Sequence, residues 1–198
     1  MPEVSHPLPA FAAALLCGGQ SRRMGRDKAW LDWESAPLWQ VQLNKLADLG
    51  PTRLLLSCRE AQRIHDDGAE LVLDPPGNAG PLPALARCLE RVQMPLLVLG
   101  VDMPCMSRDF LQYLAAQGLE TARGIICRRR EHYEPLCAVY PASVLPLLQA
   151  ATVEENFRLQ TFAQNAVRAG LLREMALGPE HEACFLNVNT PDDIPSHG

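Results

Sequence analysis

The sequence predicts an α/β fold: a single Rossmann-like domain in which helices cover both faces of a mainly parallel, twisted sheet. Three observations predict this fold. Strand and helix patterns alternate along the chain. The run Leu96–Val101 is almost wholly apolar, as parallel strands buried on both faces tend to be. The chain has 198 residues, of which 47% are hydrophobic, and these numbers suit one domain with a substantial core.

The elements of the first half follow from apolar runs and the residues that bound them. A short arm over residues 1–10 is expected to be loose, and the apolar run Phe11–Leu16 predicts the first strand. The pattern over Pro37–Leu49 predicts a helix, because proline suits the first turn and Gly50 follows the last apolar position. Further strands are expected at Arg53–Ser57, Leu71–Leu73 and Leu96–Val101, and a second helix at Pro81–Val92.

The pattern is looser in the second half, but elements can still be assigned. Ser107 is a suitable N-cap for a helix that continues to about Gln117. Two strands, Gly124–Cys127 and Leu136–Tyr140, flank a charged segment that resembles a hairpin turn. The remaining elements are expected to be helices at Ser143–Ala150 and Phe157–Ala169, a late strand at Leu171–Met175, and a loop at Asn187–Pro191 before a short terminal helix.

Composition excludes several classes of protein. The net charge of −5 argues against a general nucleic-acid binder. No apolar run approaches the roughly 20 residues that a membrane span needs, and the N-terminus lacks the pattern of a signal peptide. The seven cysteines are scattered without a CxxC pair, and the five histidines show no metal-ligand spacing. We therefore expect reduced thiols, mostly in the core, and a cytoplasmic location.

The most informative segment directly follows the first strand and reads LLCGGQSRRMGRDK, residues 15–28. Gly18 and Gly19 allow a tight turn whose N–H groups can approach a ligand closely. Arg22, Arg23 and Lys28 make this loop basic in an otherwise acidic chain, which indicates an anionic ligand. The segment is neither a Walker loop nor the dinucleotide motif GxGxxG. The alternative is an ordinary turn with solvated basic side chains.

Two aspartates follow other strands of the predicted sheet. Asp74 ends the strand at Leu71–Leu73, and Asp102 ends the strand at Leu96–Val101. In open α/β sheets, ligands bind beyond the carboxyl ends of the strands, so both aspartates are expected to lie in one crevice with the glycine loop. Asp102 is a candidate ligand for Mg²⁺, which usually takes one or two carboxylates and substrate phosphates. The alternative is a turn aspartate before Pro104.

The pattern LxGGxSxRMGxDK resembles the signature loop of the MobA-like nucleotidyltransferases, and most closely that of the molybdenum cofactor guanylyltransferases. Further segments resemble the same family in the expected order, over about Ala12 to Ile194. They are the aspartate at Asp74 followed by GPL at residues 80–82, the aspartate at Asp102, EPL-A-Y at residues 134–140, and NVNTP at residues 187–191.

The resemblance implies transfer of GMP from GTP to the terminal phosphate of molybdopterin, with release of pyrophosphate and with Mg²⁺ as cofactor. It implies catalytic roles for Arg23, Lys28 and Asp102, with Asp102 as the metal ligand. It implies nucleotide binding by Leu16, Cys17, Gly18, Gly19, Lys28, Ser57, Asp74 and Asp102, and acceptor binding by Glu134 and Asn187. Ser57 departs from the family, which commonly has asparagine there, and this bears on the choice of base.

Several alternatives stay open at this stage. One is a related enzyme, either a cytidylyltransferase for the same cofactor or a sugar- or polyol-phosphate nucleotidyltransferase. Another is a catalytically idle protein that binds or delivers the nucleotide or cofactor, although Lys28 and Asp102 are both present. Cofactor-assembly proteins and molybdenum enzymes are candidate partners. The run Arg128–Arg130 is expected to be a solvated turn, with contact to an anionic acceptor or acidic partner as the alternative.

Overall fold

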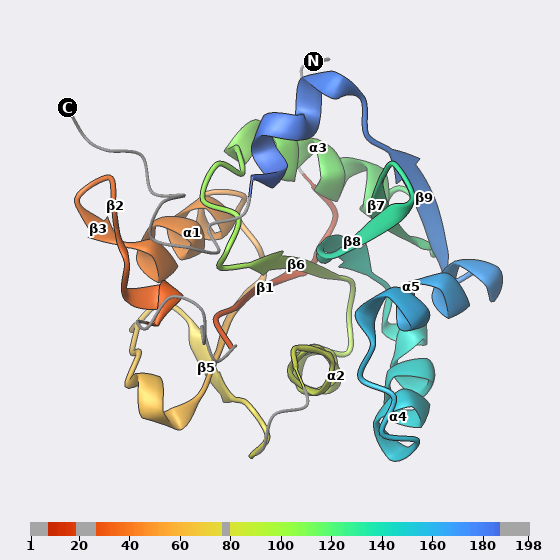
Figure 1. Ribbon diagram of the computed structural model, residues 1–198, viewed down its shortest axis with the longest axis horizontal. Helices are drawn as coiled ribbons and strands as arrows, with labels where there is room; N and C mark the ends of the chain where they lie inside the picture. Colours follow the sequence, from red (N-terminus) through yellow and green to blue (C-terminus); the bar gives the residue numbers. More distant parts are fainter. Residues whose placement is uncertain (1–7, 19–26, 77–79, 187–198) are drawn as a thin grey trace.

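A computed structural model describes residues 8–18, 27–76 and 80–186 of the chain. In these residues, seven strands form one sheet in the order β5-β4-β1-β6-β8-β7-β9 (Figure 1). The strands are β1 (Ala12–Leu16), β4 (Arg53–Cys58), β5 (Glu70–Leu73), β6 (Leu96–Gly100), β7 (Gly124–Arg129), β8 (His132–Tyr140) and β9 (Leu172–Ala176). The predicted strands are therefore all present.

The sheet is mostly parallel. Strands β5, β4, β1 and β6 pair in parallel, and β7 pairs in parallel with β9. Strand β8 pairs antiparallel with both β6 and β7, so it runs against its neighbours. Because Gly18 follows β1, which lies between the parallel strands β4 and β6, the start of the glycine loop lies beside the carboxyl ends of neighbouring strands. The predicted α/β fold is thus confirmed.

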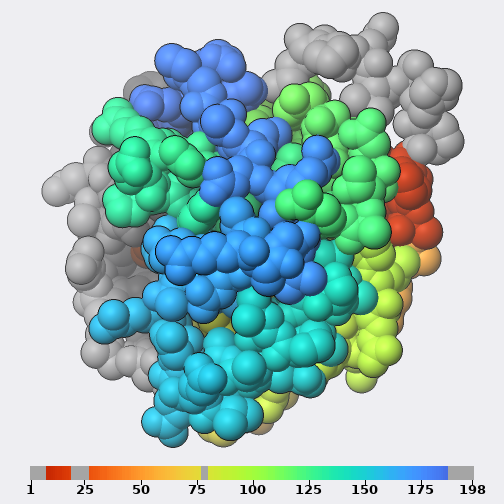
Figure 2. Space-filling model, turned by 90° about the vertical axis from the view of Figure 1, so that its right-hand side faces the viewer, coloured from red at the N-terminus to blue at the C-terminus, as the bar shows by residue number. Residues whose placement is uncertain are grey.

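Helices cover both faces of the sheet, as predicted. Helices α1 (Leu38–Ala47) and α3 (Arg108–Leu119) lie on one face, and α2 (Leu82–Val92), α4 (Leu145–Val153) and α5 (Leu159–Arg168) lie on the other (Figure 1). Alternate residues of each strand enter the two cores, as the pleat of a strand requires. Figure 2 shows that segments from the second half of the chain, including α4 and α5, cover one side of the molecule.

Alternation along β1 illustrates how the two cores are built. Ala13 and Leu15 belong to the core under α1 and α3, whereas Ala14 and Leu16 belong to the core under α2, α4 and α5. All residues of β1 are buried, which explains why the segment shows a continuous apolar run in the sequence.

Short 3₁₀ segments complete the architecture. They are η1 (Lys28–Trp30), η2 (Glu60–Gln62), η3 (Ala142–Val144) and η4 (Pro179–Phe185). The last of these returns to the face formed by α3, where the rings of Phe185 and Phe110 meet edge to face at 5.4 Å between centroids. Neither η4 nor the two-stranded ladder of β2 (Asp32–Trp33) and β3 (Ala36–Pro37) was predicted from the sequence.

One detail differs from the sequence prediction. Strand β7 extends to Arg129 and β8 begins at His132, so the charged segment is largely strand and only its tip is a turn. Trp30 is 48% exposed, whereas Trp39 is buried. Five of the seven cysteines are buried, and all seven are free thiols. No helix within residues 8–18, 27–76 and 80–186 is long and apolar enough to cross a membrane.

Candidate functional site

A cavity of about 210 Å³ lies at the carboxyl ends of β1 and β6. It combines a short stretch of backbone after β1 with one basic and one acidic side chain. Its lining residues are Leu16, Cys17, Gly18, Lys28, Pro81, Val101, Asp102 and Leu136. The site thus lies where the topology of an open α/β sheet predicts it.

Gly18 and Asp74 lie against each other beside this cavity. A Cβ added to Gly18 would overlap the carboxylate of Asp74, so any larger residue would displace that side chain. Ser57, at the end of β4, is fully buried and donates a hydrogen bond from Oγ to Oδ1 of Asp74 at 2.6 Å. The ends of β1, β4 and β5 are therefore joined through one carboxylate.

The environment of Asp74 opposes its ionisation. Burial raises the pKa of its carboxyl group, while the hydrogen bond from Ser57 and the charges of Arg59 and Arg87 partly oppose that rise. An ionised carboxylate only accepts hydrogen bonds, so Asp74 suits a ligand that presents N–H or O–H donors. Such a ligand would relieve the cost of keeping the charge in a half-buried position.

Asp102 follows β6 and faces the same cavity. Its side chain lies close to Gly100, where an added Cβ would stand 3.0 Å from Oδ1. Burial raises the pKa of Asp102, and the positive charge of Lys28 opposes the rise. Lys28 and Asp102 therefore interact electrostatically across a site that both line.

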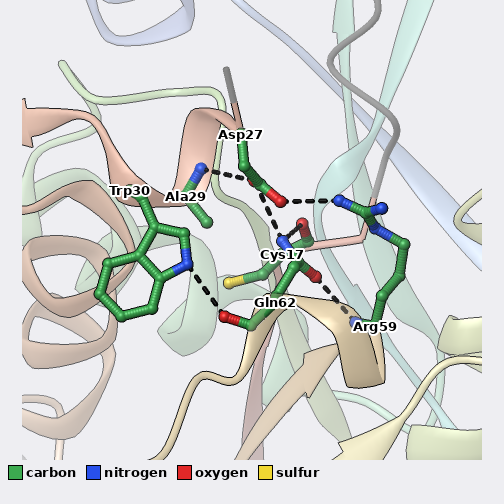
Figure 3. A network of polar contacts seen from close by, with 6 residues as sticks. All are labelled: Cys17, Asp27, Ala29, Trp30, Arg59 and Gln62. Carbon is green, nitrogen blue, oxygen red and sulfur yellow. Dashed lines mark hydrogen bonds and ion pairs between the residues drawn. The ribbon is translucent and has the colours of Figure 1, made fainter.

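A polar network surrounds Asp27, the residue directly before Lys28 (Figure 3). Asp27 is the N-cap of η1, and its Oδ1 accepts the N–H of Ala29 at 3.1 Å. The other carboxylate oxygen of Asp27 forms an ion pair of 2.6 Å with Arg59. Gln62 donates from Nε2 to Oδ1 of Asp27 at 3.1 Å and to the carbonyl of Cys17 at 3.0 Å.

The loop after Asp102 is held by helix α1. Gln42, which is fully buried, donates from Nε2 to the carbonyl of Met103 at 2.6 Å. Lys45 donates from Nζ to Oε1 of Gln42 and to the carbonyl of Pro104, both at 2.7 Å. These contacts fix the backbone that begins directly after the aspartate.

Glu134, predicted on the acceptor side, lies on β8 and does not line the cavity. It pairs with Arg129 at 2.9 Å. Burial raises the pKa of Glu134, Arg129 opposes the rise, and Asp102 is close enough to add to it. The structure thus places Glu134 near the cavity without testing its role.

The arginines of the run 128–130 are each paired with a glutamate. Arg128 contacts Glu174 at 3.1 Å and Arg130 contacts Glu182 at 3.4 Å, in addition to the Arg129–Glu134 pair. All three pairs are at least partly exposed, and such pairs contribute little each. Arg128 and Arg129 belong to β7 and Arg130 to the turn, so the run is a hairpin end whose charges are balanced.

Three residues of the predicted site lie outside the described parts of the chain. They are Gly19, Arg23 and Asn187. The structure brings together Leu16, Cys17, Gly18, Lys28 and Asp102 around the cavity, with Ser57 and Asp74 directly behind Gly18.

Sequence reasoning missed several residues of the site. Val101 and Leu136 line the cavity as apolar wall. Pro81, at the entry of α2, does so as well, and the GPL segment was the available signal. The buried residues Gln42 and Gln62 could not be identified from the sequence, because their amide groups bind backbone carbonyls of segments that are distant in the sequence.

The arrangement suits a phosphorylated ligand. It offers backbone at the end of β1, the ammonium group of Lys28 and the carboxylate of Asp102, a suitable ligand for a divalent cation. Within the described ranges, no group of three or more His, Cys, Asp or Glu could hold a metal by itself. A metal here would therefore share its coordination with the ligand's phosphates.

Most of the chain matches one protein family and several of its known members. Residues 13–169 match the MobA-like NTP transferase domain. The chain is 33% identical to a probable molybdenum cofactor guanylyltransferase of Opitutus terrae, with 93% of each chain covered. It is 30% identical to the molybdenum cofactor guanylyltransferase of Pseudomonas fluorescens, covering 96% of this chain and 95% of that one.

The fold is also similar to that of a solved structure. Molybdopterin-guanine dinucleotide biosynthesis protein A from Archaeoglobus fulgidus superposes with a TM-score of 0.72 at 21% identity, covering 92% of this chain and 94% of that chain. Nucleotidyltransferases of this kind generally use a divalent metal. The family model and the relatives cover most of the chain, and the cavity lies at the end of β1, as this fold predicts. The chain belongs to the MobA-like NTP transferase family and is a nucleotidyltransferase.

Proposed function

We propose that the protein is a molybdenum cofactor guanylyltransferase that transfers GMP from GTP to the terminal phosphate of molybdopterin. The products are molybdopterin guanine dinucleotide and pyrophosphate. The observation that carries the proposal is the single cavity lined by Gly18, Lys28 and Asp102, the elements that a bound triphosphate and its cation require. The relatives with the same name, at 33% and 30% identity over nearly the whole chain, support the choice of reaction.

The chain's own task in this reaction is to position the reactants and to neutralise charge. The backbone N–H groups at Gly18 and Gly19 bind phosphate oxygens, since glycine allows the closest approach of the main chain. Lys28 and Arg23 neutralise charge that builds up on the leaving pyrophosphate. No residue is required as a covalent nucleophile, because the acceptor phosphate attacks the α-phosphorus directly.

Asp102 is the residue that would hold Mg²⁺. Its half-buried carboxylate lines the cavity, and the increase in its pKa on burial shows the cost of an unneutralised charge there. Mg²⁺ accepts one or two carboxylates and completes its coordination with phosphates and water, so this donor fits the ion. When bound, the cation would supply charge neutralisation at the phosphates.

The nucleoside is proposed to lie toward Ser57 and Asp74. Ser57 already donates to Asp74 at 2.6 Å, so the carboxylate is oriented before any ligand binds. The remaining acceptor capacity of Asp74 suits donor groups of the base or sugar. Ser57 stands in place of the amide that is common in the family, so a cytidylyltransferase for the same cofactor is the alternative.

The acceptor is proposed to approach from the side of Glu134 and Asn187. Cofactor-assembly proteins and molybdenum enzymes remain proposed partners, and a cytoplasmic location remains a proposal from the scattered cysteines.

The product of the reaction tests the proposal. The full chain is incubated with Mg²⁺, GTP and molybdopterin, and the products are identified by mass spectrometry. We expect one dinucleotide and one pyrophosphate for each GTP consumed. Pyrophosphate without the dinucleotide would mean another acceptor, and intact GTP would mean a binding protein.

A further inference from the structure

Three segments that are distant in sequence meet at one buried amide behind the cavity. Gln62, which is 5% exposed, belongs to η2 after β4. Its Nε2 donates to the carbonyl of Cys17 after β1 and to the carboxylate of Asp27 before η1. Its backbone carbonyl accepts the indole N–H of Trp30 at 3.0 Å (Figure 3). The end of β1 and both sides of Lys28 are therefore tied to the same residue.

Arg59 closes this network. Its guanidinium binds the free oxygen of Asp27 at 2.6 Å, and its backbone N–H donates to Oε1 of Gln62 at 2.7 Å. Asp27 thus accepts three hydrogen bonds, from Ala29, Gln62 and Arg59, and each comes from a different position. Because both carboxylate oxygens are bound, the Asp27 side chain can move little. The position of Lys28, the first residue of η1, is therefore restrained as well.

The side chains of Asp27, Arg59 and Gln62 do not line the cavity, whereas Lys28 and Cys17 do. Lys28 directly follows Asp27, and Cys17 is the residue whose carbonyl Gln62 binds. The network therefore reaches the cavity through Lys28, which follows Asp27, and through the carbonyl of Cys17, which Gln62 binds. Displacements of about 1 Å in positioned groups can cost about a hundredfold in rate, so a fixed start for η1 has a catalytic consequence.

We propose that Asp27, held by Arg59 and Gln62, is a positioning residue that sets the place of Lys28 relative to the backbone after β1. The proposal rests on the proposed function in one respect, because it takes Lys28 to act on the phosphates of the substrate. It assigns a role to side chains that do not line the cavity and would touch neither substrate nor cation.

The test is a double-mutant cycle between Asp27→Ala and Lys28→Ala, measured as kcat/KM for GTP by pyrophosphate release. If Asp27 acts through Lys28, Asp27→Ala lowers kcat/KM at least about tenfold in the native background and less than about twofold when Lys28 is already alanine. Arg59→Met is expected to lower it in the same direction. Equal losses in both backgrounds would overturn the proposal.

A matched control is available at the other end of β4. Arg53 begins β4, whereas Arg59 directly follows its end. Arg53 pairs with Glu70 of β5 at 2.6 Å, the same distance as in the Arg59–Asp27 pair. Arg53→Met therefore removes a comparable ion pair without touching the site. We expect its kcat/KM to stay within about twofold of the native value. A loss equal to that of Arg59→Met would mean a general effect on stability and would contradict the proposal.

A second readout does not depend on activity. Asp27→Ala removes the acceptor for the N–H of Ala29, so hydrogen exchange in the segment 28–31 should rise at least about tenfold, while β4 stays protected. Unchanged exchange in that segment would overturn the positioning role even if the protein proved to use another substrate. Increased exchange in a protein that releases no pyrophosphate with any nucleotide would leave the positioning role standing and overturn the proposed function alone.

Discussion

The carboxylate of Asp74 occupies the place that a side chain on Gly18 would need. A side chain at this position after β1 would thus displace Asp74, the residue that directly follows β5. This contact joins the loop that binds phosphate in the proposed function to the strand end that is proposed to face the nucleoside.

Replacement of Gly18 tests that contact. Gly18→Ala must displace Asp74 or the backbone of the loop, and we expect kcat/KM for GTP to fall about a hundredfold, the cost of a shift of about 1 Å. The measurement is steady-state pyrophosphate release. Gly68→Ala is the control, because Gly68 is exposed and an added Cβ would only approach Oδ1 of Asp66 at 3.3 Å. Equal activity of Gly18→Ala and the native chain would show that Asp74 has no fixed role.

Lys28 and Asp102 carry the electrostatic part of the proposed mechanism. Lys28→Ala and Asp102→Ala are each expected to lower turnover at least about tenfold, since each removes a charge that is preorganised around the phosphates. Both variants should remain folded, as judged by circular dichroism and thermal unfolding. Rates close to the native rate in either variant would remove that residue from the mechanism.

The pKa of Asp74 has a consequence for stability. Burial raises it above the ordinary value of 3.8, so the folded protein holds this proton more tightly than the unfolded chain. Stability from this group is present at acidic pH and is lost as the pH rises through the folded pKa. Asp74→Asn should therefore have a higher Tm than the native chain at pH 7, and this difference should shrink at pH 4.

The same variant should lose activity, because the amide offers a weaker acceptor to the nucleoside. Asp32→Asn, on an exposed strand residue, serves as the control for both measurements. A native Tm that exceeds that of Asp74→Asn at pH 7, with no change toward pH 4, would show that Asp74 is stabilised as an anion. That result would contradict the account of its environment.

Gln42 provides a prediction for the loop after Asp102. Gln42→Leu leaves the carbonyl of Met103 without its donor in a buried position and removes an acceptor from Lys45, so we expect a loss of about 1–3 kcal/mol in unfolding free energy. Apparent Mg²⁺ affinity in the assay should fall as well. Gln149→Leu is the control, because its hydrogen bond to Glu90 is exposed. Similar effects of the two substitutions would show that α1 does not hold this loop.

The strands near the site could be predicted because they are buried on both faces. The runs Phe11–Leu16 and Leu96–Val101 coincide closely with β1 and β6, and the aspartates at strand ends follow from the same pattern. The position of Gly18, Lys28 and Asp102 around one cavity then follows from the topology of a parallel sheet. The glycine loop and the aspartates at the strand ends could thus be predicted from local signals.

Other parts could not be predicted because they depend on contacts between distant segments. Gln42 and Gln62 are buried with hydrogen bonds to the backbone carbonyls of Met103 and Cys17, which are distant in the sequence. The arginines at the end of β7 and in the turn after it pair with glutamates from β8, β9 and η4. Neither relationship leaves a periodic pattern in the sequence. The same holds for Trp30, which is half exposed and donates its indole N–H to the carbonyl of Gln62.

The most direct test of the central claim is pyrophosphate release with Mg²⁺ and each of the four ribonucleoside triphosphates, with and without molybdopterin. The account predicts release with GTP only, and only when molybdopterin is present. Release with CTP would contradict the assignment of the base while leaving the site chemistry intact. No release with any nucleotide in the presence of molybdopterin would contradict the proposed reaction.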